Sequence, residues 1–237
     1  KTYDYYKEGN RSFIPLFFIS YHLFHKDIDN NALMSYFNSY ETDNADFPLM
    51  KRWLYHSLIN GVFRSKGVGW IPYKTGIRKI LDTIKDYKNR EFPTETLFSV
   101  YKNHPIAFTT NYTTDNLDQL DSSFVFYLMY DRARTTRAND VDHMMPKNIL
   151  EAKGYEWNKI NSIKNFQLID LGTNRGAKNG KPFKEWVDNP EYVKSKSAYV
   201  KLHLIPKDET LWTEDKFEEF IQARATLILT KLTTYAN

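Results

Sequence analysis

The sequence predicts an α+β protein that is mainly helical, with a helical domain over residues 1–131 followed by a mixed domain over residues 132–237. Three observations support this prediction. Apolar residues recur at spacings of three and four through most of the first half. After Arg137 the pattern changes to two short apolar runs that are typical of strands, followed by further helices. The 237 residues, 41% of them hydrophobic, are enough for two such domains.

The helical domain is predicted from the spacing of its apolar side chains. In the segment that begins at Phe47, Leu49, Trp53 and Leu58 keep to one side. A loop with two glycines, residues 64–70, interrupts the pattern. The aromatic residues of this half are expected in its core and not on a base-stacking platform. The predicted helices cover residues 13–27, 31–40, 47–63, 75–90, 94–103 and 120–132.

The second half is predicted to hold two strands, a loop and two helices, over residues 140–145, 165–170, 172–180, 183–187 and 214–232. Pro182 stands where a proline opens a helix, in its first turn. Thr213 is a favourable N-cap for the last helix, with Glu214 and Asp215 in the first turn, where they complement the helix dipole.

The composition excludes several classes of protein. There is no cysteine, which excludes disulfides and thiolate zinc sites and fits a reducing, cytoplasmic setting. No apolar run approaches the roughly 20 residues of a membrane span, so no membrane partner is expected, and no signal peptide is visible. Because the chain begins with Lys1 and not with Met, we expect it to be part of a longer protein with an upstream domain.

The positive charge is concentrated in one part of the chain. Residues 132–201 hold 14 Lys and Arg against 8 Asp and Glu, whereas residues 1–131 hold 15 of each. Clustered positive charge favours a polyanion such as nucleic acid, although a solvated lysine surface explains the charge alone equally well.

The segment from Asp140 to Pro146 carries the strongest sign of chemistry, because Asp142 directly precedes His143. The carboxylate can hold a divalent cation and the imidazole can take a proton from water beside it. Asn165, on the facing strand, is predicted to orient the imidazole through an amide or carbonyl oxygen. Asn174, near the following helix, offers a second oxygen ligand for a hard ion such as Mg²⁺, with Mn²⁺ also possible. These parts suffice for phosphodiester hydrolysis.

Each of these residues also has a simpler interpretation. Asp142 and His143 occur together by chance in many proteins, Asn165 can satisfy backbone groups at a strand end, and Asn174 can serve as a turn or cap residue. His203 is expected to be structural. The same core could also act as a non-catalytic module that docks on DNA or on a partner, and RNA remains an alternative substrate.

The order of these residues resembles the HNH nucleases with a ββα-metal core, in the variant that ends in asparagine. More narrowly, it resembles the C-terminal nuclease domain of GmrSD-type restriction endonucleases, and residues 1–131 look like the helical region that precedes it. The stretches that carry the resemblance are Asp142-His143-x-x-Pro146, Ile163-Lys-Asn165-Phe-Gln-Leu168, Asn174 with a following lysine, and Trp212–Arg224.

The resemblance implies a metal-dependent DNA endonuclease that defends against foreign or modified DNA. It also implies an upstream ParB-like nucleotide-binding domain that this chain lacks. In the family a basic residue usually follows the final asparagine closely, whereas Gly176 and Ala177 separate the first lysine, Lys178, from Asn174 and Arg175 here. Lys178 is therefore expected at the phosphate, with Lys181 nearly as suitable and Arg175 beside them.

Overall fold

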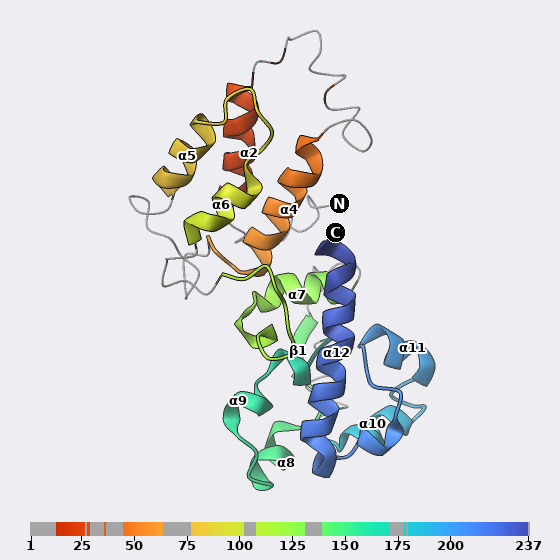
Figure 1. Cartoon of the computed structure of the whole chain (residues 1–237). Coiled ribbons are helices and arrows are strands. Elements are labelled where there is room, and N and C mark those ends of the chain that lie inside the picture. Colours follow the sequence, from red (N-terminus) through yellow and green to blue (C-terminus); the bar gives the residue numbers. More distant parts are fainter. Residues whose placement is uncertain are drawn as a thin grey trace. The chain divides into compact units, whose positions relative to one another are not determined.

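The structure, a computed structural model, describes residues 13–26, 28, 36, 45–63, 77–101, 108–130, 139–170, 178 and 180–236. Contacts divide the chain into two compact units, whose main segments are Gly9–Asn111 and Tyr112–Tyr235. The described part of the chain is mainly helical, with one two-stranded sheet (Figure 1). The sequence placed the boundary between domains after residue 131, whereas these contacts group the helix at residues 122–129 with the C-terminal unit.

The N-terminal unit is built from four described helices around an aromatic core. They are α2 (Ile14–His25), α4 (Asp46–Ile59), α5 (Arg78–Lys85) and α6 (Thr94–Tyr101). All four were predicted, and the predicted helix over residues 31–40 lies, except for residue 36, outside the described residues. Trp53 is fully buried at the centre, in contact with the rings of Phe18, Phe63 and Phe98.

The C-terminal unit contains shorter elements around one long helix, α12. Lys159 contacts Glu218 of α12 at 2.7 Å, and the rings of Phe183 and Phe220 meet at 5.2 Å. In chain order the elements are η2 (Leu117–Gln119), α7 (Ser122–Met129), β1 (Asn139–His143), α8 (Lys147–Ala152), α9 (Trp157–Ile160), η3 (Ile163–Asn165), β2 (Phe166–Asp170), α10 (Phe183–Asp188), α11 (Lys196–Leu202), η5 (Glu209–Leu211), η6 (Glu214–Lys216) and α12 (Phe217–Ala236).

α10 begins at Phe183 as predicted, whereas α12 begins three residues later than predicted. Pro182 is the residue before α10, with extended ψ of 142°, and the Glu214 carboxylate accepts a hydrogen bond from the Phe183 N–H at 2.9 Å. Glu214 therefore caps a different helix from the one it precedes. Residues 214–216 form the 3₁₀ turn η6, and α12 begins only at Phe217.

The two strands form an antiparallel ribbon that pairs Asp142 with Gln167 and His143 with Phe166. The next residues toward the loop, Met144 and Asn165, are joined by a backbone hydrogen bond of 2.7 Å. Asn165 was expected on the strand, but it is the last residue of η3, directly before β2. Among the described residues, no helix combines the length and the apolar character needed to cross a bilayer.

Candidate functional site

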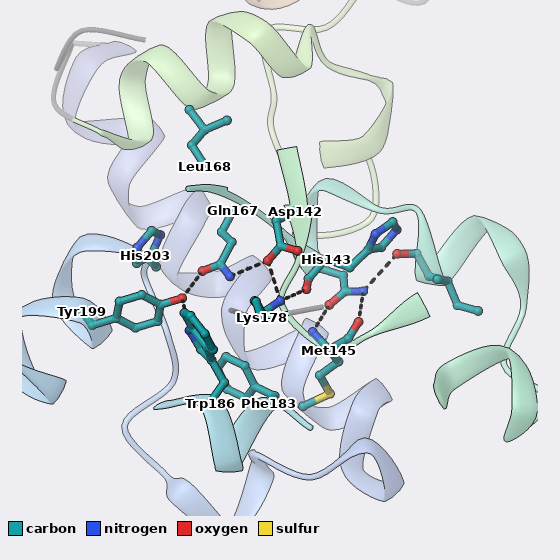
Figure 2. A network of polar contacts seen from close by, with 12 residues as sticks. Asp142, His143, Met145, Gln167, Leu168, Lys178, Phe183, Trp186, Tyr199 and His203 are labelled. Atoms are coloured by element: carbon teal, nitrogen blue, oxygen red, sulfur yellow. Dashed lines mark hydrogen bonds and ion pairs between the residues drawn. The ribbon is translucent and has the colours of Figure 1, made fainter. Parts of the chain in front are cut away.

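Strand β1 delivers Asp142 and His143 to opposite faces of the ribbon, because successive side chains of a strand alternate. Asp142 and its partner Gln167 are buried on the inner face, whereas His143 and Phe166 are half-buried on the other face. Figure 2 shows the imidazole of His143 directed away from the carboxylate of Asp142. The sequence predicted that the two groups act side by side at one cation. They lie instead on the two faces of the ribbon, so the site has an inner and an outer side.

On the outer side, a hydrogen bond to Asn161 orients the imidazole of His143. Its Nε2 lies 3.1 Å from the Oδ1 of Asn161, and the Asn161 amide donates through Nδ2 to the carbonyl of Trp157 at 2.9 Å. This second bond fixes which end of the amide faces the ring. An amide oxygen only accepts, so Nε2 carries the proton and Nδ1 is the acceptor nitrogen of the neutral ring.

The surroundings of His143 favour the neutral ring. Burial lowers the pKa of His143 below its ordinary value, and the hydrogen bond to Asn161 and the charge of Asp142 only partly oppose this. The edge of the ring meets Phe166, with ring centroids 4.8 Å apart. Near pH 7 the imidazole is therefore a base whose Nδ1 can accept a proton.

On the inner side, Asp142 belongs to a buried polar network. Its Oδ2 accepts from the Nε2 of Gln167 at 2.8 Å and from the Nζ of Lys178. The Oε1 of Gln167 accepts in turn from the Tyr199 hydroxyl at 2.7 Å, and the Trp186 indole donates to that hydroxyl at 3.2 Å. The network, drawn in Figure 2, joins both strands to α10 and α11.

The position of Lys178 corrects the sequence-based expectation. A lysine in a glycine-containing loop was expected at the rim of the site, but Lys178 is only 2% exposed. Its ammonium contacts both the Asp142 carboxylate and the carbonyl oxygen of His143. Burial lowers the pKa of Lys178, and the carboxylate of Asp142 opposes that effect. In this arrangement Lys178 is the counter-ion of Asp142 and cannot reach a phosphate in solution.

The side chain of Asn165 braces the backbone and leaves the imidazole to Asn161. It is fully buried, its Oδ1 accepts from the Met145 N–H at 3.0 Å, and its Nδ2 donates to the carbonyls of Met145 and Ile160 at 3.2 and 3.1 Å. These bonds tie the loop after His143 to the end of α9. These bonds agree with the simpler interpretation, in which Asn165 satisfies backbone groups. Asn161, and not Asn165, makes the expected contact with the imidazole of His143.

Two further side chains hold η3, and with it Asn165, in place. Asp118 accepts from the hydroxyl of Ser162 at 2.7 Å and from the N–H of Ile163 at 2.9 Å. From the other direction, the fully buried guanidinium of Arg224 donates to the carbonyls of Ile163 and Lys164 at 3.2 and 2.7 Å. Residues on η2 and α12 thus fix the start of β2.

The remaining predicted residues are only partly placed. Asn174 and Arg175 lie outside the described residues. Lys181 is half-buried, and its ammonium lies 5.4 Å from the centre of the Tyr192 ring. His203, expected to be structural, is buried with its Nδ1 2.9 Å from the Tyr130 hydroxyl.

The donors around Asp142 determine how well a divalent ion fits. Within the part of the chain that the structure describes, no three His, Cys, Asp or Glu side chains cluster as metal ligands. However, the Asp142 Oδ2 and the His143 carbonyl converge on one cationic atom, the Lys178 Nζ. Two hard oxygens around a position held by a cation fit the donor preference of Mg²⁺ or Mn²⁺, provided that the ammonium leaves.

Sequence reasoning missed Asn161, Gln167 and Arg224. No local pattern marks Asn161, because it follows α9, a helix of four residues that is itself too short to predict. Gln167 is a polar residue within β2 and lies opposite Asp142, and the register of the strands alone reveals this pairing. Arg224 lies on α12 among apolar residues, where a charge needs an acceptor.

Comparison with known proteins gives no family for this chain. No protein-family model matches it, and a search of curated proteins gives no match.

Proposed function

We propose that the C-terminal unit is an HNH-type endonuclease that hydrolyses phosphodiester bonds in DNA, with His143 as the general base. The observation that carries the proposal is the tether of the imidazole, in which Nε2 donates to Asn161 and Nδ1 is left as the acceptor. A base that is neutral near pH 7 is what activation of water requires, and the lowered pKa of His143 supports that role.

The proton then has a defined path. Nδ1 takes a proton from a water molecule, whose oxygen attacks phosphorus while the bond to the 3′ oxygen breaks; that oxygen leaves with the bonding electrons and takes a proton from solvent. The imidazolium that forms keeps its Nε2–H bond to Asn161. Asn161 acts through His143 and is therefore a positioning residue.

A divalent ion, Mg²⁺ or Mn²⁺, stabilises the charge that develops on phosphate when it is bound. We propose Asp142 as its ligand, because this carboxylate and the His143 carbonyl already surround a cationic position. Asn174 is the second ligand that the sequence predicts.

DNA is the proposed substrate because the basic excess of residues 132–201 lies in the same part of the chain as His143. Lys181 and Arg175 are the proposed phosphate contacts. The resemblance to GmrSD-type enzymes extends the proposal to defence against foreign or modified DNA, together with an upstream ParB-like domain.

The test is nicking of supercoiled plasmid with Mg²⁺ or Mn²⁺ and with EDTA. His143→Ala should lower the rate by about 10²–10⁴-fold, the usual cost of losing a general base. His25→Ala, in the N-terminal unit, is the matched control and should cut like the wild type. Equal rates for His143→Ala and wild type would remove His143 from the mechanism, and full activity in EDTA would remove the metal.

The second candidate is a non-catalytic module that docks on DNA or on a partner subunit. The observation that favours it is the occupied carboxylate of Asp142, whose charge is already balanced by Lys178. This candidate predicts a salt-dependent DNA complex in EDTA with no nicking under any metal. A parallel assay on single-stranded and duplex RNA separates the choice of nucleic acid from the choice between cutting and binding.

A further inference from the structure

The Lys178 ammonium occupies the position at which Asp142 would hold a metal. Its Nζ contacts the Asp142 Oδ2 and the His143 carbonyl, two oxygens from adjacent residues of one strand. Both partners of the ion pair are buried, with 2% and 11% of the side chains exposed. Gln167 donates to the same Oδ2, so the carboxylate remains held even when Lys178 moves.

A metal at this position and the ammonium cannot both bind the Asp142 Oδ2 and the His143 carbonyl. They compete for the same two oxygens, and two positive charges side by side in a buried setting repel each other strongly. Lysine suits exchange because its charge is a single atom on a flexible four-carbon stem, so the ammonium can leave without moving either strand.

We propose that Lys178 is the resident cation of the Asp142 site and that a divalent ion enters by displacing it. In the metal-free protein Lys178 then neutralises the charge of Asp142. The affinity for the metal is set by how much more strongly the two oxygens bind the divalent ion than the ammonium. The inference rests on the proposed function only for the class of ion, a hard divalent cation. It deepens that function by naming the side chain that regulates entry of the metal.

The first experiment measures Mn²⁺ binding by isothermal titration calorimetry on the full chain. Lys178→Met removes the competitor and should bind Mn²⁺ at least about tenfold more tightly than the wild type, which corresponds to a modest part of the strength of a buried ion pair. Lys153→Met is the matched control, since Lys153 also pairs with an aspartate, Asp215 at 2.6 Å, but on the surface. Asp142→Asn should abolish the Mn²⁺ isotherm.

Three outcomes of the titration overturn the proposal. One is a dissociation constant for Lys178→Met that equals or exceeds the wild-type value. A second is the absence of Mn²⁺ binding in both proteins. If Lys153→Met gains affinity as Lys178→Met does, the effect is one of net charge and the proposal also fails.

The second experiment needs no variant, and it decides the matter if Lys178→Met does not fold. Brief acetylation of the wild-type protein followed by peptide mass spectrometry reports the reactivity of each lysine. Lys178 should be modified far more slowly than the exposed Lys153 without metal, and saturating Mn²⁺ should raise the labelling of Lys178 several-fold. Labelling of Lys178 that does not change with Mn²⁺ overturns the proposal.

Neither readout depends on cleavage, so the two proposals fail separately. A protein that releases Lys178 on binding Mn²⁺ but never nicks DNA keeps this inference and loses the endonuclease. A protein that nicks DNA with Mg²⁺ while Lys178 stays protected keeps the endonuclease and loses this inference.

Discussion

Replacing Asn165 by alanine should destabilise the C-terminal unit strongly, because its amide is used completely by the backbone around it. The side chain is fully buried and makes three hydrogen bonds, with the N–H and C=O of Met145 and with the C=O of Ile160. Met145 and Ile160 are themselves buried, so water cannot replace the lost amide.

The magnitude follows from these three bonds. Each contributes on the order of 1 kcal/mol net, and each backbone group left unpaired in the interior adds a desolvation cost. Asn165→Ala should therefore lower the free energy of unfolding by about 3 kcal/mol, a large part of the total for an ordinary domain. Asn161→Ala is the control, because Asn161 is only half-buried. This variant should lower the free energy of unfolding by about 1 kcal/mol or less.

Urea denaturation followed by circular dichroism and tryptophan fluorescence gives both values. The same two proteins, assayed for nicking under conditions where each is folded, should show the reverse order, since Asn161 accepts the hydrogen bond of the imidazole whereas the amide of Asn165 is bonded to the backbone of Met145 and Ile160. The reasoning is refuted if Asn165→Ala unfolds within about 1 kcal/mol of the wild type, or if Asn161→Ala is the less stable of the two.

Two further predictions concern buried charge. Burial lowers the pKa of His203 to about 3, so between the unfolded value of about 6.5 and pH 3 only the unfolded chain takes up this proton. The contribution of His203 to the free energy of unfolding should therefore be full above pH 6.5 and about 2 kcal/mol smaller at pH 5. His203→Gln should reduce this loss in urea denaturation at pH 7.5 and 5.0. An equal loss of stability between these two pH values in the variant and the wild type would contradict the prediction. Arg224→Met should cost about 2–3 kcal/mol, since it leaves the carbonyls of Ile163, Lys164 and His203 without their donor, and wild-type stability in thermal unfolding would show that these bonds contribute nothing net.

The sequence predicted the long helices because their apolar residues recur at spacings of three and four, and it predicted both strands from short runs that include apolar residues. The helices it missed, α8, α9 and α11, have six, four and seven residues, too few for a period to repeat. The start of α12 was placed three residues early because Glu214 looks like a first-turn acid of its own helix. Its carboxylate instead caps α10 in the folded chain, which no local pattern reveals.

The sequence identified several residues of the candidate site but not the contacts that they make. Asn165 stands out in the sequence because it is a polar residue at the edge of an apolar run, and that holds whether it positions a base or braces a loop. The choice depends on where the loop after His143 folds back, which is a tertiary fact. Lys178 was expected at a phosphate because the resemblance to HNH nucleases implies a basic residue after the final asparagine. A carboxylate on the inner face of β1 explains its burial.

The carbonyl of His143 links the two sides of the site. Lys178 binds this oxygen and the carboxylate of Asp142 together, while the imidazole of the same histidine projects to the other face of β1. Release of the ammonium by a metal therefore changes the hydrogen bonding of the residue that carries the proposed base. The hydrogen bond that His143 donates to Asn161 keeps the ring oriented through that change, because Asn161 lies between α9 and η3 and not in the Lys178 loop. Different residues therefore control entry of the metal and orientation of the base: Lys178 the first and Asn161 the second. The two are linked through His143, whose carbonyl contacts Lys178 and whose imidazole bonds to Asn161.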